Sequence, residues 1–203
     1  MAKINKSNNP LQTALKLSIA GNLIDFAAKH TFNETDLFDM IEHIDHINLS
    51  LDYSKDLFRQ LKKAKSLLYL GDNCGEIVID KCLIKILKRY YPHLTITYGV
   101  RGIPIVNDVT IKDAREVKMN EIAQIISNGD GSLGTVIERT SRDFQTCFSS
   151  SDVVIAKGQG NYEGLRHVNK ENMYFLFMAK CDVIASSVGV SKMGIVCSKN
   201  KNR

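Results

Sequence analysis

The sequence predicts a three-layer α/β protein, with a mostly parallel sheet between two helical layers and a further helical layer at the N-terminus. Two observations lead to this prediction. Short apolar runs of strand length alternate with amphipathic segments of helical length from residue 66 to residue 198, which is typical of parallel strands joined by helices. The 203 residues, 44% of them hydrophobic and 24% charged, can bury one core of this kind.

The first 65 residues are predicted to be helical, because apolar side chains such as Leu11, Leu15 and Ile19 recur at helical spacing. The predicted helices span 10–30, 34–48 and 54–65. We expect 1–65 to form a helical segment that packs as a layer or cap on an α/β core of residues 66–203.

From residue 66 onward, apolar or β-branched runs predict strands, and amphipathic segments bounded by Gly, Pro or Asn predict helices. The first run ends at Gly71, and the helix after it ends before Pro92. The predicted strands are 66–70, 94–100, 153–156, 173–178 and 194–198, with 121–127 as a strand or a short helix. The predicted helices are 75–90, 110–117, 133–148 and 182–188.

Composition argues against several classes of protein. The net charge is +5, but Lys and Arg are interleaved with Asp and Glu, and no aromatic-lined basic face predicts nucleic-acid binding. The five cysteines have no metal-ligand spacing, which favours free thiols in a reducing compartment. Neither a signal-peptide run nor a membrane-length apolar stretch is present in the sequence. We therefore expect a cytoplasmic protein with no membrane or nucleic-acid partner.

Three polar loops follow predicted strands, and the carboxyl ends of parallel strands meet at one sheet edge, where ligands bind. In the first loop, the Asp72 carboxylate and the Asn73 carbonyl suit a hard divalent cation. Glu76 opens the following helix and could orient a water or a substrate hydroxyl. By itself this loop reads more simply as a helix-capping turn.

The second loop spans residues 101–108, and Asp108 could complete an oxygen ligand set with Asp72 and Asn73. Arg101 could bind a phosphate or carboxylate through two nitrogens, and Asn107 is a weaker candidate for substrate binding. Alone, this loop too is typical of an ordinary turn and cap.

In the third loop, Lys157 stands at a strand end where a cation could meet phosphoryl oxygens. Gly158 allows close backbone approach to a ligand, and we count Asn161 with the substrate-binding residues. The dinucleotide motif G-x-G-x-x-G is broken at Glu163, and no Walker motif is present.

Together the three loops predict metal-assisted phosphate chemistry. Asp72, Asn73 and Asp108 would hold Mg²⁺ or Mn²⁺, with Co²⁺ or Ni²⁺ as alternatives, and Lys157 would offset charge that develops in the transition state. In the resulting assignment Asp72, Asp108 and Lys157 are catalytic.

A few other residues could belong to the site or could have a structural role alone. Asn22 and Asp25 either approach the site from the N-terminal helix or cap locally, with neither reading favoured. Cys74 is read as a small buried residue rather than a zinc thiolate. Asn128 and Gly129 either line the cleft or, as we favour, form a simple turn.

Five stretches resemble the damage-control phosphatase family of ARMT-like, metal-dependent phosphatases. They are G-N-L-I-D at 21–25, D-N-C-G-E-I-V-I-D at 72–80, V-R-G-I-P-I-V-N-D-V-T at 100–110, K-G-Q-G-N-Y-E at 157–163 and A-K-C-D-V-I-A at 179–185. The resemblance implies a Rossmann-like α/β/α core with the metal at Asp72, Asn73 and Asp108 and the substrate phosphate at Lys157. It also implies sugar phosphates or damaged phosphometabolites as substrates.

The sequence differs from the stand-alone prokaryotic members of this family at its N-terminus, which is shorter here and lacks their C-x-x-C pair. We expect this difference to affect the substrate cap. The sequence therefore predicts a metal-dependent phosphomonoester hydrolase acting on a small phosphorylated metabolite. The alternatives are a non-catalytic phosphometabolite-binding protein and an S-adenosylmethionine-dependent methyltransferase; the oligomeric state is not predicted.

Overall fold

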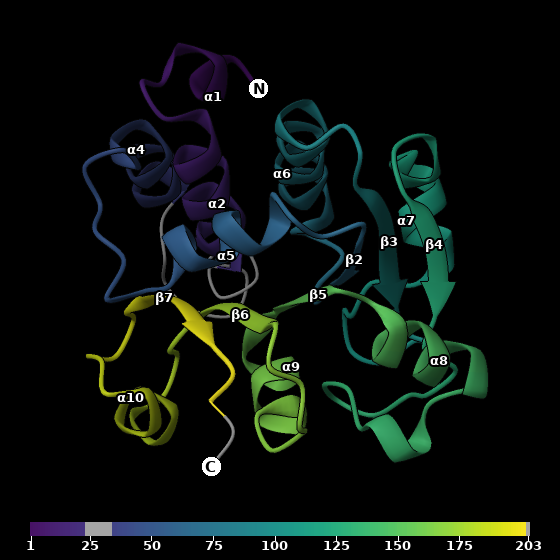
Figure 1. Cartoon of the computed structure of the whole chain (residues 1–203). Helices are drawn as coiled ribbons and strands as arrows, with labels where there is room; N and C mark the ends of the chain where they lie inside the picture. The colour runs from purple at the N-terminus through teal and green to yellow at the C-terminus, as the bar shows by residue number, and fades with distance from the viewer. Residues whose placement is uncertain (23–33, 202–203) are drawn as a thin grey trace.

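A seven-stranded sheet forms the centre of the molecule, in the order β1-β7-β6-β5-β2-β3-β4 (Figure 1). The computed structural model describes residues 1–22 and 34–201. The strands are β1 (Leu51–Asp52), β2 (Ser66–Leu70), β3 (Thr95–Val100), β4 (Gln124–Ser127), β5 (Val153–Lys157), β6 (Met173–Met178) and β7 (Ile195–Lys199). The predicted α/β class is confirmed.

The sheet is mostly parallel, and its strand order reverses next to β2. The chain runs outward from β2 through β3 to β4, and then returns to the other side of β2 as β5, followed by β6. The antiparallel pair is β6 with β7, and β1 is parallel to β7. The switch point between β2 and β5 is the place where open α/β sheets bind ligands.

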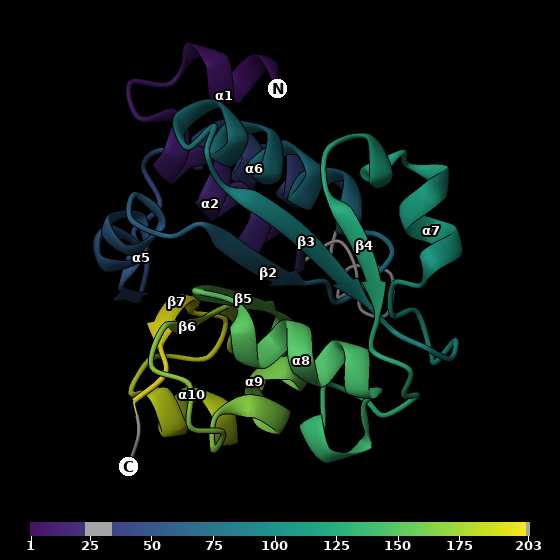
Figure 2. The ribbon, with the colours of Figure 1, turned by 45° about the vertical axis from the view of Figure 1, so that its right-hand side comes forward.

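Helices cover both faces of the sheet (Figure 2). One face carries α1 (Ala2–Lys6), α2 (Pro10–Ala20), α4 (Glu34–His43), α5 (Ser54–Leu61), α6 (Ile77–Tyr90) and α7 (Ile111–Glu116). The other carries α8 (Arg142–Ser150), α9 (Gly158–Leu165) and α10 (Asp182–Val188). Two short 3₁₀ turns, η1 (Met119–Glu121) and η2 (Ile137–Arg139), complete the described elements.

The alternation of side chains along each strand divides the core into two clusters. In β2, Leu67 and Tyr69 face the α2 and α6 side, whereas Leu68 and Leu70 face the α8 side. Each cluster is apolar because both faces of a parallel sheet are covered. The N-terminal helical layer is therefore continuous with one of these two cores.

Most predicted elements are confirmed, and the differences have local causes. The helix predicted over 133–148 is wrong in its first half: Gly134 adopts φ +78°, and α8 begins only at Arg142, capped by the Ser141 side chain. The third loop is not a loop either, since α9 begins at Gly158, directly after β5.

At the N-terminus, α1 and the two-residue β1 were not predicted, because so short a strand leaves no pattern in the sequence. Part of the predicted helix 10–30 lies outside the described residues, and α4 ends at His43 instead of residue 48. The division of the chain at residue 65 stays a prediction. Among the described helices, none is long and apolar enough to cross a membrane.

Asp56 joins α5 to the sheet and gives the fold a pH dependence. Its carboxylate accepts a hydrogen bond from Tyr174 Oη at 2.6 Å and pairs with Lys199 Nζ at 3.0 Å. The hydrogen bond from Tyr174 lowers the pKa of Asp56 to about 2. Burial opposes this shift, and Lys199 adds to it. A carboxyl whose pKa falls on folding stabilises the protein above its unfolded pKa and loses that effect as the pH drops.

We expect Asp56→Asn to reduce the free energy of unfolding by about 1–2 kcal/mol near neutral pH. The deficit should shrink as the pH falls from about 4 to about 2, the interval between the unfolded and folded pKa values. Urea unfolding across this range measures it, with the exposed Asp39→Asn as the control. A deficit independent of pH would contradict the assignment.

Candidate active site

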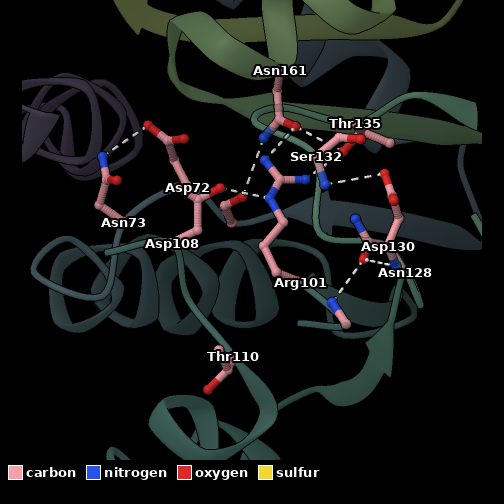
Figure 3. Close-up of polar contacts among 12 residues, drawn as sticks. Asp72, Asn73, Arg101, Asp108, Thr110, Asn128, Asp130, Ser132, Thr135 and Asn161 are labelled. Atoms are coloured by element: carbon pink, nitrogen blue, oxygen red, sulfur yellow. Dashed lines mark hydrogen bonds and ion pairs between the residues drawn. The ribbon is translucent and has the colours of Figure 1, made fainter. Parts of the chain in front are cut away.

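Residues from the ends of β2, β3 and β5 meet at one edge of the sheet, and Figure 3 shows those that follow β2 and β3. Asp72 and Asn73 follow β2, Arg101 and Asp108 follow β3, and Lys157 ends β5. All five are buried, although they come from loops and strand ends. The predicted shared edge is confirmed.

Backbone hydrogen bonds hold the first two loops against each other. Asn73 and Asp108 form an isolated antiparallel bridge, Cys74 N donates to Asn107 O at 2.8 Å, and Val109 N donates to Asp72 O at 2.8 Å. This pairing places the Asp72 and Asp108 side chains near each other, as Figure 3 shows. The three predicted metal-ligating residues are therefore neighbours, although Asp108 follows Asn73 by 35 positions in the sequence.

The Lys157 amine points into the protein rather than toward solvent. Its Nζ donates to Glu76 Oε2 at 2.9 Å and to Asp80 Oδ1 at 2.7 Å, and all three side chains are fully buried. Asp80 also accepts hydrogen bonds from Tyr69 at 2.7 Å and Ser18 at 2.9 Å. The contact of Lys157 with a substrate phosphate stays a prediction, and so does a substrate role for Glu76.

Two asparagines connect Glu76 to the loop after β2. Asn73 Nδ2 lies 3.0 Å from both Asp72 Oδ2 and Glu76 Oε1. Asn22 Nδ2 lies 2.5 Å from Glu76 Oε1 and 3.4 Å from Asp72 Oδ2, so Asn22 does approach the site from the N-terminal helix. Its Oδ1 is buried and has no hydrogen-bond partner among the described residues. Asp25, its suggested companion, lies outside them.

Arg101 and Asn161 form the other half of the site. Arg101 donates through Nε to Asp108 Oδ2 at 2.6 Å, through Nη1 to Thr135 Oγ1 at 2.8 Å and through Nη2 to Asn161 Oδ1 at 3.1 Å. Asn161 Nδ2 donates to the backbone oxygens of Gly71 and Lys157. These contacts give both side chains a positioning role, while their binding of substrate stays a prediction.

Gly158 lets the start of α9 approach the loop after β2. It adopts φ +79°, and a Cβ atom there would stand 1.9 Å from Asp72 Oδ2. A Cβ atom on Gly134 would likewise stand 2.1 Å from Gly160 O. Only glycine permits approaches this close, so these residues set the distance between α9 and the polar loops.

The sequence did not single out Thr135, Asp80 or Ser18. Thr135 lies in the segment that was predicted to be helical, and Asp80 and Ser18 lie on helices assigned only to packing. A signal was present for Asp80, because it follows Glu76 by four positions and so shares its helix face.

Two other expectations have clear outcomes. Cys74 is exposed rather than buried, so that expectation is wrong. Asn128 is more than a simple turn residue, because its Oδ1 accepts from Gly102 N at 2.8 Å and Asp130 N at 2.9 Å and thus ties the loop after β4 to the loop after β3.

The charges of the site do not balance. Asp72, Glu76, Asp80 and Asp108 are four buried carboxylates, and Lys157 and Arg101 are the two buried cations beside them. Burial, then the charges of Glu76 and Asp108, raise the pKa of Asp72 to about 8. Burial also raises the pKa of Asp80, while Lys157 opposes this rise. Burial tends to lower the pKa of Lys157, but Asp80 and Glu76 outweigh it and raise that pKa.

Four carboxyl groups beside two cations, with Asn73 as an amide neighbour, form a donor set that fits a hard divalent cation. In the part of the chain that the structure describes, no cluster of three or more His, Cys, Asp or Glu side chains has metal-binding geometry. A cation would therefore depend on Asn73 together with Asp72 and Asp108.

The fold and the site define an α/β protein with a buried, acidic polar centre at the switch point of its sheet. The chain belongs to a particular family of such proteins: residues 1–196 match the family model described as the damage-control phosphatase ARMT1-like domain.

Curated relatives support this membership. The chain is 37% identical over 190 residues to the damage-control phosphatase PH1575 of Pyrococcus horikoshii, covering 94% of this chain and 65% of that protein. It is 33% identical over 187 residues to a damage-control phosphatase of Archaeoglobus fulgidus, covering 91% and 64%. An uncharacterized protein of Methanocaldococcus jannaschii, MJ0202, is 37% identical over 185 residues, covering 89% and 60%. The chain thus spans less than two thirds of their length.

A solved structure agrees with the fold. The crystal structure of the P. horikoshii protein PH1575, described as a member of the DUF89 family, superposes with a TM-score of 0.87 at 35% identity. The match covers 98% of this chain and 70% of that one.

Gly158→Ala should lower the free energy of unfolding by more than the cost of placing alanine at a positive φ. The matched control is Gly189→Ala, because Gly189 also has positive φ (+71°) but has nothing within 4 Å of the added Cβ. Both variants should lose about 1 kcal/mol from the backbone, and Gly158→Ala about 1–3 kcal/mol more from contact with Asp72. Urea unfolding measures the difference, and equal losses would show that the close approach is not limiting.

Lys157→Met should leave Glu76 and Asp80 as unpaired buried carboxylates. We expect the free energy of unfolding to fall by about 3–5 kcal/mol, with partial recovery when Asp80→Asn is added to remove one of the charges. The exposed Lys62→Met serves as the control in the same urea titrations. A loss no larger than that of the control would contradict the buried ion pairs.

Proposed function

We propose that this chain carries the active centre of a metal-dependent phosphatase that hydrolyses small phosphate esters, such as sugar phosphates or damaged phosphometabolites. The observation that supports it is the gathering of four buried carboxyl groups beside only two buried cations at the switch point of the sheet. A cytoplasmic location and a small phosphorylated metabolite as partner are parts of the same proposal.

Asp72, Asn73 and Asp108 are the residues that would hold the cation, Mg²⁺ or Mn²⁺, with Co²⁺ or Ni²⁺ as alternatives. They fit because hard cations prefer carboxylate and amide oxygens. When bound, the cation would supply Lewis-acid polarisation of the phosphoryl group.

The protein's own contribution is to hold these ligands in place. Arg101 fixes Asp108 through a buried ion pair with an Nε–Oδ2 distance of 2.6 Å, and Asn161 ties Arg101 to the ends of β2 and β5. Behind them, Lys157 offsets the charge of Glu76 and Asp80. Preorganised groups of this kind need no rearrangement when charge develops in the transition state.

The substrate would approach from the exposed side of the pocket. Cys74 and Gly75 are exposed at the start of α6, and Asn107 is half-buried on the facing loop. The carboxyl groups of Asp72 and Asp108 would repel a phosphate ester placed there unless a cation offset their charge, which is a second reason to propose a metal.

Asp108 provides the direct test. We expect Asp108→Ala to lower metal-stimulated hydrolysis of p-nitrophenyl phosphate by at least about 100-fold, because it removes a ligand and frees Arg101. Asp108→Asn keeps an oxygen for Arg101 and preserves the fold if the alanine variant unfolds.

The control for this assay is Asp143→Ala, an exposed acid in the first turn of α8, which should keep full activity. Turnover retained by both Asp108 variants would contradict the proposal. Manganese-dependent thermal stabilisation without any phosphate release would instead favour a non-catalytic phosphometabolite-binding protein.

A further inference from the structure

A cavity of about 800 Å³ lies away from the active site, on the α9 and α10 face of the sheet. It opens between the C-terminal ends of these helices, beneath β1 and β7. Lys199 pairs with Tyr174 at the beginning of β6, so this is the edge of the sheet opposite to the polar loops. None of the active-site residues described above lines it.

The cavity is basic. Its described lining includes Arg166, His167, Lys199 and Lys201, and no Asp or Glu. Lys199 is neutralised by Asp56 at 3.0 Å, but in the described part of the chain no ion pair joins Arg166 or Lys201 to a carboxylate. The carbonyl ends of α9 and α10 offset about half a charge each, so part of the positive charge is left for a ligand.

Aromatic rings lie beside Arg166 and Lys201, which have no ion pair in the described part of the chain; Arg166 Nε also donates to His167 Nε2 at 3.0 Å. The guanidinium carbon of Arg166 is 5.7 Å from the ring centre of Tyr162, and Lys201 Nζ is 5.6 Å from that of Tyr53. A wall that combines cations with tyrosine rings suits a molecule with both an anionic group and a planar ring.

Ser198 supplies an independent observation. Its side chain lies on the same strand face as that of Val196, lines the cavity and is only 5% exposed. The hydroxyl oxygen has no hydrogen-bond partner among the described residues. Buried hydroxyls are nearly always satisfied, so a residue of the cavity lining carries a hydroxyl whose hydrogen-bonding capacity no described group of the protein uses.

A solvated basic surface at two helix ends would explain Arg166 alone, since cations are favoured there. It does not explain a concave site of ligand size or the unsatisfied Ser198 hydroxyl. We propose that this cavity binds a phosphate monoester with a planar ring, of mononucleotide size. Arg166 and Lys201 receive the phosphate, Ser198 donates a hydrogen bond, and Tyr53 or Tyr162 contacts the ring.

Calorimetry with adenosine 5′-monophosphate on the metal-free, full 203-residue chain tests this inference separately from phosphatase activity. We expect saturable binding that weakens about tenfold in Arg166→Ala and in Lys201→Ala, because each removes a charged hydrogen-bond donor. Lys62→Ala removes an equal charge from an exposed site at the end of α5 and should bind normally.

Adenosine, which lacks the phosphate, should bind at least about tenfold more weakly. Absence of heat at millimolar nucleotide, equal affinity in all three charge variants, or equal binding of adenosine would each overturn the proposal.

Ser198→Ala separates a ligand contact from a structural one. Because the hydroxyl has no protein partner to lose, its removal should leave the melting temperature unchanged or raised. Nucleotide affinity should nevertheless fall about fivefold. A lowered melting temperature, or unaltered affinity, would count against the assigned role.

Discussion

Four carboxylates share two cations in the interior of this protein, and the rest of the site depends on that arrangement. A buried carboxylate is costly unless it is paired, protonated or bound to a cation. Lys157 relieves Glu76 and Asp80, and Arg101 relieves Asp108. Asp72 has no ion pair with either cation, and burial, then the charges of Glu76 and Asp108, raise its pKa to about 8. The free-energy cost of burying a carboxylate therefore falls mainly on Asp72, which lies at the switch point of the sheet.

The sheet makes this concentration of charge possible, because several of the partner pairs join different elements. Lys157 on β5 meets acids on α6, and Arg101 after β3 meets Asn161 on α9. Gly158 and Gly134 allow the backbone of α9 and the loop before α8 to close on these pairs. The polar centre therefore depends on the alignment of β2, β3 and β5, and its contacts between elements also tie these strands together.

The sequence was sufficient to predict where the site lies but not how its side chains are used. Asp72, Asn73 and Asp108 were identified because strand ends in a parallel sheet share an edge. The inward direction of Lys157 was missed, although it follows from alternation: Ile155 packs on the α2 and α6 side, so Lys157 faces that side as well. The pairing of Arg101 with Thr135 was not predictable, because the loop that carries Thr135 has no regular pattern and was assigned to a helix.

Helix α9 runs from the acidic centre at one edge of the sheet to the basic cavity at the opposite edge. Its first turn is held against Asp72 by Gly158 and tied to β2 by Asn161, while Tyr162 and Arg166 in its last turn face the basic cavity. A helix of two turns, packed this closely at its start, has little freedom at its end. The position of the cavity wall is thus set by the same glycine contacts that shape the acidic centre, so that two regions of opposite charge are built on one short element.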